Sequence, residues 1–111
     1  MALSEATIQK KILDWLKREG YWAVKVMQCN RNGCPDILVS IDGHFVGIEV
    51  KNTGKIKNVS VLQRYQINQI NHSGGLAFVT DSLPDCQTKI KTIKDGIING
   101  TNLPTMRFQN G

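Results

Sequence analysis

The chain has 111 residues, of which 41% are apolar and 21% are charged, and its formal net charge is +5. This length and composition predict a single globular domain with one modest core. They exclude a disordered or fibrous chain, and no apolar run is long enough to span a membrane. The basic charge is compatible with a polyanionic partner such as a nucleic acid, although charge alone does not identify one.

The cysteines and histidines do not have the spacing of a zinc site. Cys29, Cys34 and Cys86 form no CxxC pair, and His44 and His72 lie far apart in the sequence. An odd number of cysteines and the lack of a signal peptide favour a reducing, cytoplasmic location. A bacterial or phage-infected cell is compatible with this expectation.

The first predicted element is an amphipathic helix that runs from Glu5 to about Glu19. Ser4 is a favoured N-cap residue, and Gly20 is a natural end. Apolar side chains recur at helical spacing on one face, at Ile8, Ile12, Trp15 and Leu16. We expect this face to pack on the core.

Three strands are predicted in the next part of the chain. The first covers residues 21–28, where β-branched and aromatic side chains are frequent, and a polar turn follows it. The second and third, 36–41 and 44–51, form a β-hairpin because Asp42-Gly43 suits a two-residue turn of the primed type.

The remaining sequence predicts a helix, a strand and a helix. Ser60 caps a helix that runs to residue 71, a short buried strand covers 76–80, and a last helix covers 82–98. A strand that follows a helix is most simply parallel to its neighbour, so we expect an α/β fold with a mixed sheet in the order αβββαβα. Residues 1–98 then form the domain, and 99–111 form a C-terminal tail.

Two acids are placed side by side by the predicted hairpin. A two-residue turn at 42–43 sets a register in which Asp36 lies opposite Glu49. Lys51 shares a side of the sheet with Glu49, because strand side chains repeat every second residue. Directly opposed like charges destabilise a sheet, so the acids need a compensating cation, either Lys51 or a bound metal. If the hairpin is considered alone, an exposed ion pair between Glu49 and Lys51 explains the placement of these charges equally well.

The aromatic residues are predicted to serve the core. Each falls on or near an apolar face, which favours packing over the stacking of nucleic-acid bases. This set contains Trp15, Tyr21, Trp22 and Phe45.

A longer set of residues favours a functional site at the two acids. Gly33-Cys-Pro-Asp-Ile-Leu precedes Gly47-Ile-Glu-Val-Lys51, and Gln63 follows on the next helix. The set resembles the PD-(D/E)XK nuclease superfamily and, more narrowly, the VRR-NUC family. The resemblance extends from Glu5 to Thr80, and it departs from the usual pattern at Asn52-Thr53.

This resemblance implies a restriction endonuclease-like core and a DNA endonuclease dependent on Mg²⁺ or Mn²⁺. Hard carboxylate oxygens suit these ions, so Asp36 and Glu49 are the expected ligands, with the backbone carbonyl of Val50 as the family pattern implies. The Lys51 ammonium can orient the attacking water and stabilise charge on the phosphate.

Glu5 and Gln63 join this site only through the resemblance. An acid in the first turn of a helix is also what the helix dipole favours, and a glutamine on a helix is usually only solvated. The resemblance implies that Glu5 belongs to the metal site and that Gln63 lies near the lysine and the phosphate.

Four basic residues near these positions could hold the phosphate backbone without reading its sequence, namely Arg31, Lys55, Lys57 and Arg64. The relatives imply branched or otherwise structured DNA as the substrate, as for Holliday junction resolvases. A duplex-cutting or nicking enzyme of restriction type and a non-catalytic nucleic-acid-binding module remain alternatives. We expect a homodimer, since paired cuts need two active sites, with a nicking monomer as the alternative.

Overall fold

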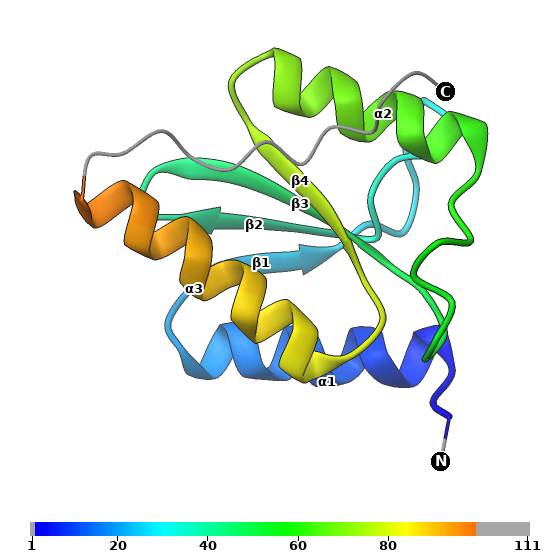
Figure 1. Cartoon of the computed structure of the whole chain (residues 1–111), viewed down its shortest axis with the longest axis horizontal. Helices are drawn as coiled ribbons and strands as arrows, with labels where there is room; N and C mark the ends of the chain where they lie inside the picture. The colour runs from blue at the N-terminus through cyan, green and yellow to red at the C-terminus, as the bar shows by residue number, and fades with distance from the viewer. Residues whose placement is uncertain (1, 100–111) are drawn as a thin grey trace.

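The computed structural model describes residues 2–99. Residue 1 and residues 100–111 lie outside the described part, and with them almost all of the predicted C-terminal tail. The described residues form three helices and four strands in the predicted order (Figure 1). Their bounds are α1 Glu5–Arg18, β1 Trp22–Lys25, β2 Ile37–Ile41, β3 His44–Val50, α2 Val61–His72, β4 Leu76–Thr80 and α3 Leu83–Asn99.

The four strands form one mixed sheet in the order β1-β2-β3-β4, which confirms the predicted fold class. The first three strands are antiparallel, and β4 is parallel to β3 after the crossover through α2. Asp42 and Gly43 both have positive φ, of 48° and 85°, as a primed turn requires. The hairpin therefore has the predicted register, with Ile37 paired to Ile48.

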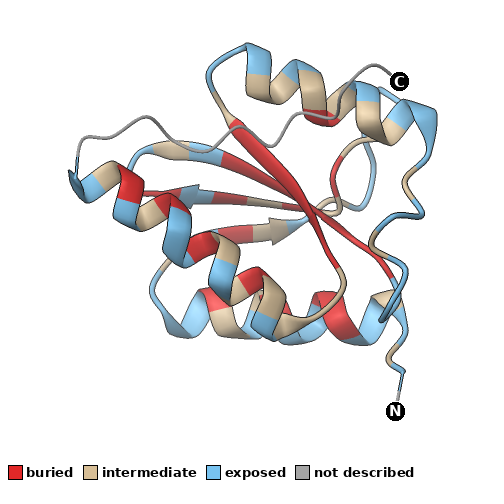
Figure 2. Ribbon diagram, in the orientation of Figure 1, coloured by how far each residue is buried: buried red, intermediate tan, exposed pale blue. Residues whose placement is uncertain are grey.

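One face of the sheet is covered by α1 and α3 (Figure 1). The buried stripe of α1, formed by Ile8, Ile12 and Leu16, packs against alternate residues of the strands, among them Ile48 and Val50. Figure 2 shows these buried segments where the two helices meet the sheet. Burial of a continuous apolar surface here supplies most of the hydrophobic stabilisation of the domain.

The other face is only half covered. Helix α2 contacts β4 and β3, and Ile67 of the helix packs on Ala77 and Val79 (Figure 1). No helix of residues 2–99 covers β1 and β2 on this side, and this part is called the open half of the sheet below. Trp22 on β1 lies on the open half, and Phe45 at the start of β3 lies at its border; they are 68% and 49% exposed, so their predicted place in the core was wrong.

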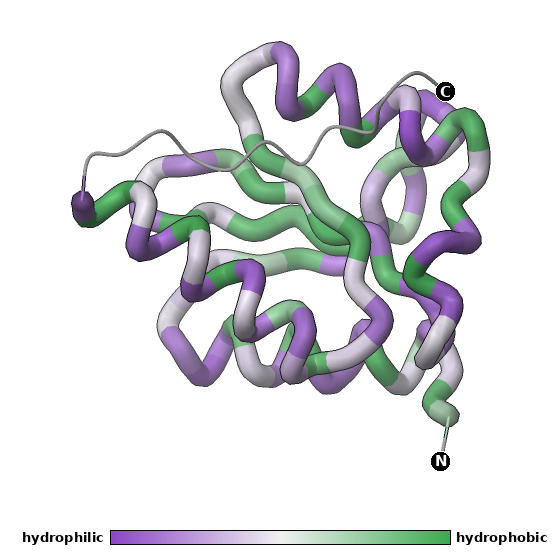
Figure 3. Tube along the Cα trace, viewed as in Figure 1, coloured by the Kyte–Doolittle hydropathy of each residue, from purple (hydrophilic) through white to green (hydrophobic). Residues whose placement is uncertain are grey.

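Two of the four aromatic predictions hold. Trp15 and Tyr21 pack against the large core, because they lie on the side of α1 and α3. Figure 3 shows that the strands are the most hydrophobic part of the chain, while the helices alternate between hydrophilic and hydrophobic residues. Among residues 2–99, no helix is both long enough and apolar enough to cross a membrane.

The segment between β1 and β2 also differs from the prediction. Strand β1 ends at Lys25 instead of residue 28, and a disulfide joins Cys29 to Cys34. No pairing of these two cysteines was predicted; the turn between them brings their Cα atoms to 6.7 Å. Cys86 is free and buried.

Candidate active site

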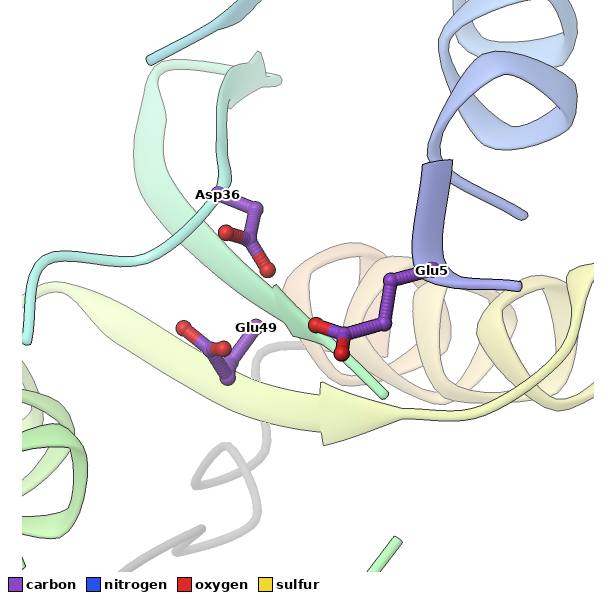
Figure 4. Close-up of side chains that lie close together, drawn as sticks. All are labelled: Glu5, Asp36 and Glu49. Carbon is purple, nitrogen blue, oxygen red and sulfur yellow. The ribbon is translucent and has the colours of Figure 1, made fainter. Parts of the chain in front are cut away.

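Three carboxylates come together at one end of the sheet. Asp36 directly precedes β2, Glu49 is the penultimate residue of β3, and Glu5 is the first residue of α1. One oxygen from each lies within 4.8 Å of the others. Figure 4 shows the three side chains pointing toward one another from separate elements. Such a group of hard oxygens could hold a metal ion.

The start of α1 is attached to the segment that follows Lys51. The Glu5 amide donates to Asn52 Oδ1 at 2.9 Å, and the Leu3 amide donates to Thr53 Oγ1 at 3.0 Å. The Thr53 amide donates in return to the Leu3 carbonyl. Asn52 and Thr53, which depart from the family pattern, thus position Glu5 beside the other two acids.

The backbone of β3 fixes Asp36. Its Oδ2 accepts a hydrogen bond of 2.8 Å from the Val50 amide, while the Asp36 carbonyl accepts from the Val26 amide. The side chain of Asp36 is therefore held across the end of the hairpin, opposite Glu49. Val50 is buried at the site, and ligation by its carbonyl stays a prediction.

Lys51 and Gln63 surround the other side of Glu49. The Lys51 ammonium lies 3.5 Å from Glu49 Oε2 and donates to Gln63 Oε1 at 2.7 Å, and Gln63 Nε2 donates to Glu49 Oε2 at 3.0 Å. Gln63 is also the N3 residue of a capping box with Ser60, so its amide is held at both ends. The structure brings all five predicted residues of the site together.

Glu49 is the most strongly perturbed group of the site. It is only 2% exposed, and burial, with the charge of Asp36 as the next cause, raises its pKa to about 8. Its Oε1 has no hydrogen-bond partner among the described residues. A buried oxygen without a partner is costly, and a divalent cation would satisfy it, so the donor set fits Mg²⁺ or Mn²⁺.

The four predicted phosphate-binding residues lie in different settings. Lys55 and Lys57 are exposed in the loop before α2 and line a hollow of about 680 Å³. Arg31 is exposed in the loop that the disulfide closes. Arg64 is half-buried on α2, and its Nε has no hydrogen-bond partner among the described residues. Their contacts with phosphate stay predictions.

Sequence analysis missed one further polar residue on α1. Gln9 is 9% exposed, and its Oε1 is buried without a hydrogen-bond partner among the described residues. It lies one helical turn after Glu5, and residues four apart on a helix share a face. The sequence could have indicated a buried polar residue near Glu5, since Gln9 lies between the apolar positions Ile8 and Ile12 of the stripe.

The comparison with known proteins rests on structure. No family model and no curated protein matches the sequence. One similar solved structure, "VRR_NUC domain", is 25% identical at a TM-score of 0.69, with 78% of this chain and 94% of that chain covered. The chain has the fold of VRR-NUC domains. A second structure, "VRR_NUC domain protein", also has a TM-score of 0.69 at 18% identity, covering 83% and 88% of the two chains.

The resemblance predicted from the sequence is thereby confirmed, as is the restriction endonuclease-like core. The VRR-NUC fold covers most of the chain and indicates a nuclease-type domain.

Proposed function

We propose that this VRR-NUC domain is an endonuclease that hydrolyses phosphodiester bonds in DNA with Mg²⁺ or Mn²⁺. The observation that carries the proposal is the group of three carboxylates within 4.8 Å, beside the bonded Lys51 and Gln63. The buried, unpartnered oxygen of Glu49 supports it, because a cation would satisfy that atom.

In this proposal Asp36 and Glu49 hold the cation, with the Val50 carbonyl as a further ligand. Glu5 completes the site from α1, either directly or through water. When bound, the cation acts as a Lewis acid toward the phosphate and lowers the pKa of water. Binding requires Glu49 to lose its proton, since its pKa of about 8 keeps the carboxyl largely protonated at neutral pH without metal.

Lys51 acts on the phosphate and the attacking water. Its ammonium has three donors, and Gln63 Oε1 occupies one of them at 2.7 Å. The other protons can be directed at a phosphate oxygen and at the water, where they stabilise the negative charge that builds up during hydrolysis. Gln63 positions the ammonium, because the capping box with Ser60 fixes its own amide.

The substrate in this proposal is branched or otherwise structured DNA, held by phosphate contacts to Arg31, Lys55, Lys57 and Arg64. This choice rests on the sequence resemblance described above, and the net charge of +5 is compatible with any polyanion. The proposed setting is the cytoplasm, and a bacterial or phage-infected cell is compatible with it.

We further propose a homodimer as the working unit, because paired cuts across a branch need two active sites related by a two-fold axis. The apolar stripes of α1 and α3 are buried inside the domain, so a second copy must use another surface. Light scattering at micromolar concentration, with and without four-way DNA, tests this. A monomer in both samples that still makes paired cuts would refute it.

The nuclease proposal is tested by incubating linear, nicked and four-way DNA with the wild-type protein in Mg²⁺, Mn²⁺ or EDTA. We expect cleavage only with metal and fastest on the four-way DNA. Equal rates on all three DNAs would favour a duplex-cutting enzyme. Binding without cleavage in either metal would favour a non-catalytic module and contradict the proposal.

A further inference from the structure

A groove runs along the open half of the sheet, between the disulfide loop and α2. Its cavity volume is about 670 Å³. The floor is apolar and includes Leu38, Phe45 and Pro35, and Met27 at its edge is 82% exposed. Since 49% of Phe45 is exposed, an aromatic ring edge or face is open to a ligand there.

The groove lies on the same face of the sheet as the candidate active site. Side chains on one face of a strand repeat every second residue, so Phe45, Gly47 and Glu49 point to the side of α2. Four residues of β-strand rise about 13 Å. A DNA strand that passes Glu49 covers this distance within a few nucleotides, at about 3.4 Å for each stacked base.

Pro35 lies between the groove and the acids. It precedes Asp36 in sequence and lines the groove, and a Cβ added to Gly47 would lie 2.9 Å from its Cγ. Glycine at position 47 therefore lets the Pro35 ring lie directly on the sheet. The Pro35 side chain therefore separates the groove from the candidate active site.

The polar residues of the groove favour a polyanion. They are Lys25, Arg31, Gln28 and Gln66, and none of the aspartates and glutamates among residues 2–99 lines the groove. The wall formed by the loop is held in place before any ligand binds. The disulfide closes it, the Val26 amide donates to the Asp36 carbonyl, and Gln66 Nε2 donates to the Asn32 carbonyl.

We propose that this groove binds an unstacked base of the cleaved DNA strand, a few nucleotides from the scissile phosphate. The proposal rests on the nuclease function proposed above and adds how its substrate is held. Phe45 and the apolar floor would stack on the base without selecting its identity, and Arg31 would hold a flanking phosphate. Branch points and single-stranded ends supply bases that unstack at low cost, so the groove would favour such DNA over continuous duplex.

The test uses the full chain and four-way DNA with 2-aminopurine placed singly at successive positions on both sides of the cleaved bond. Fluorescence is recorded in EDTA, where no cleavage is expected. Phe45→Ala removes the stacking ring, and Tyr65→Ala is the matched control, because Tyr65 is also aromatic and 56% exposed but does not line the groove. Met27→Glu is a second groove variant, which adds a negative charge at an exposed loop position. It tests the groove even if Phe45→Ala fails to fold.

We expect wild-type protein to change the emission at one or two positions on one side of the cleaved bond. Phe45→Ala and Met27→Glu should lose this change and bind the DNA roughly tenfold more weakly, while Tyr65→Ala retains both. Equal behaviour of the groove variants and the control would overturn the proposal.

The same samples also distinguish two other outcomes. A change in oligomeric state by light scattering in Phe45→Ala or Met27→Glu, with unchanged emission, would assign the groove to a second copy and overturn base binding. If wild-type protein cuts no DNA in Mg²⁺ or Mn²⁺, the nuclease function fails, whereas the fluorescence still reports separately on the groove.

Discussion

The two faces of the sheet differ in what their side chains do. On the face of α1 and α3, every strand contributes apolar residues to one continuous core. On the face of α2, the same strands carry Asp36, Glu49 and an exposed Phe45, and the cover is incomplete. Neighbours in β3 thus serve separate purposes, since Ile48 points into the core while Glu49 faces α2. One strand thus contributes core side chains on one side and side chains of the candidate active site on the other.

The largest effects are expected from changes at the site itself. Asp36→Ala, Glu49→Ala or Lys51→Ala should lower the rate of cleavage by at least roughly 100-fold to 1,000-fold, because each removes charge from the reacting phosphate or its cation. Circular dichroism should show a folded protein in each case. A folded variant with near-normal turnover would contradict the assignment of the site.

The opposite pattern is expected at Ile48, next to Glu49 in β3, where a substitution should lower stability and leave activity nearly unchanged. Ile48→Ala should lower the free energy of unfolding by about 2–5 kcal/mol, because it opens a cavity in the core. Its folded fraction should still cut DNA at close to the wild-type rate. Urea unfolding and activity at low temperature measure the two quantities, and a loss of both in Ile48→Ala would show that the two faces are not separate.

A smaller effect is expected from removing one of the facing acids. Above about pH 8, where Glu49 is ionised, Asp36→Asn should stabilise the metal-free protein, because it removes a like charge opposite Glu49 and keeps an oxygen for the Val50 amide. Mg²⁺ should shrink this gain, since only the wild type recovers a counter-charge on binding. Thermal melts in EDTA and in Mg²⁺ compare the two, and an unchanged difference would mean that the acids do not share a metal.

The stability of the metal-free protein should also depend on pH through Glu49. Its pKa rises from 4.5 to about 8 on folding, so between these values the folded state holds a proton that the unfolded state has lost. This contribution is complete below about pH 4.5 and disappears as the pH rises through 8. Urea unfolding between pH 5 and pH 8.5 should show a steeper decline for wild type than for Glu49→Gln, and parallel curves would contradict the raised pKa.

The smallest effect is expected at Gln9. Gln9→Leu should raise the free energy of unfolding by about 1 kcal/mol, because it replaces a buried oxygen that lacks a partner with an apolar group of similar size. Gln66→Leu on α2 is a control, since its amide bonds to the Asn32 carbonyl. A loss of stability in Gln9→Leu would show that Gln9 Oε1 is bonded in solution, for example to water.

Much of the site could be predicted because its geometry is local. The two-residue turn fixes the hairpin, and the register then sets Asp36 beside Glu49 without any long-range contact. The Ser60 cap likewise fixes the start of α2, whereas the place of Gln63 in the site was implied only by the family resemblance. Sequence periodicity is sufficient for such features, because each depends on fewer than about twenty neighbouring residues.

The features that were missed depend on distant packing. Strand alternation shows that Phe45 is on one face, but the position of α2 decides whether that face is covered. The contact of Asn52 with the Glu5 amide joins residues 47 apart, and nothing in either segment indicates the other. The Cys29–Cys34 disulfide depends on the path of the loop between β1 and β2. Tertiary contacts, rather than local propensity, determined all three.

The central claim is that the acids on the face of α2 hold a divalent cation for cleavage of DNA. It is tested most directly by single-turnover cleavage of four-way DNA as a function of Mn²⁺ concentration, with wild type and Glu49→Gln side by side. We predict a saturable dependence on Mn²⁺ for wild type, no cleavage in EDTA, and no cleavage by folded Glu49→Gln at any Mn²⁺ concentration. Cleavage by wild type in EDTA, or wild-type rates for Glu49→Gln, would contradict the claim.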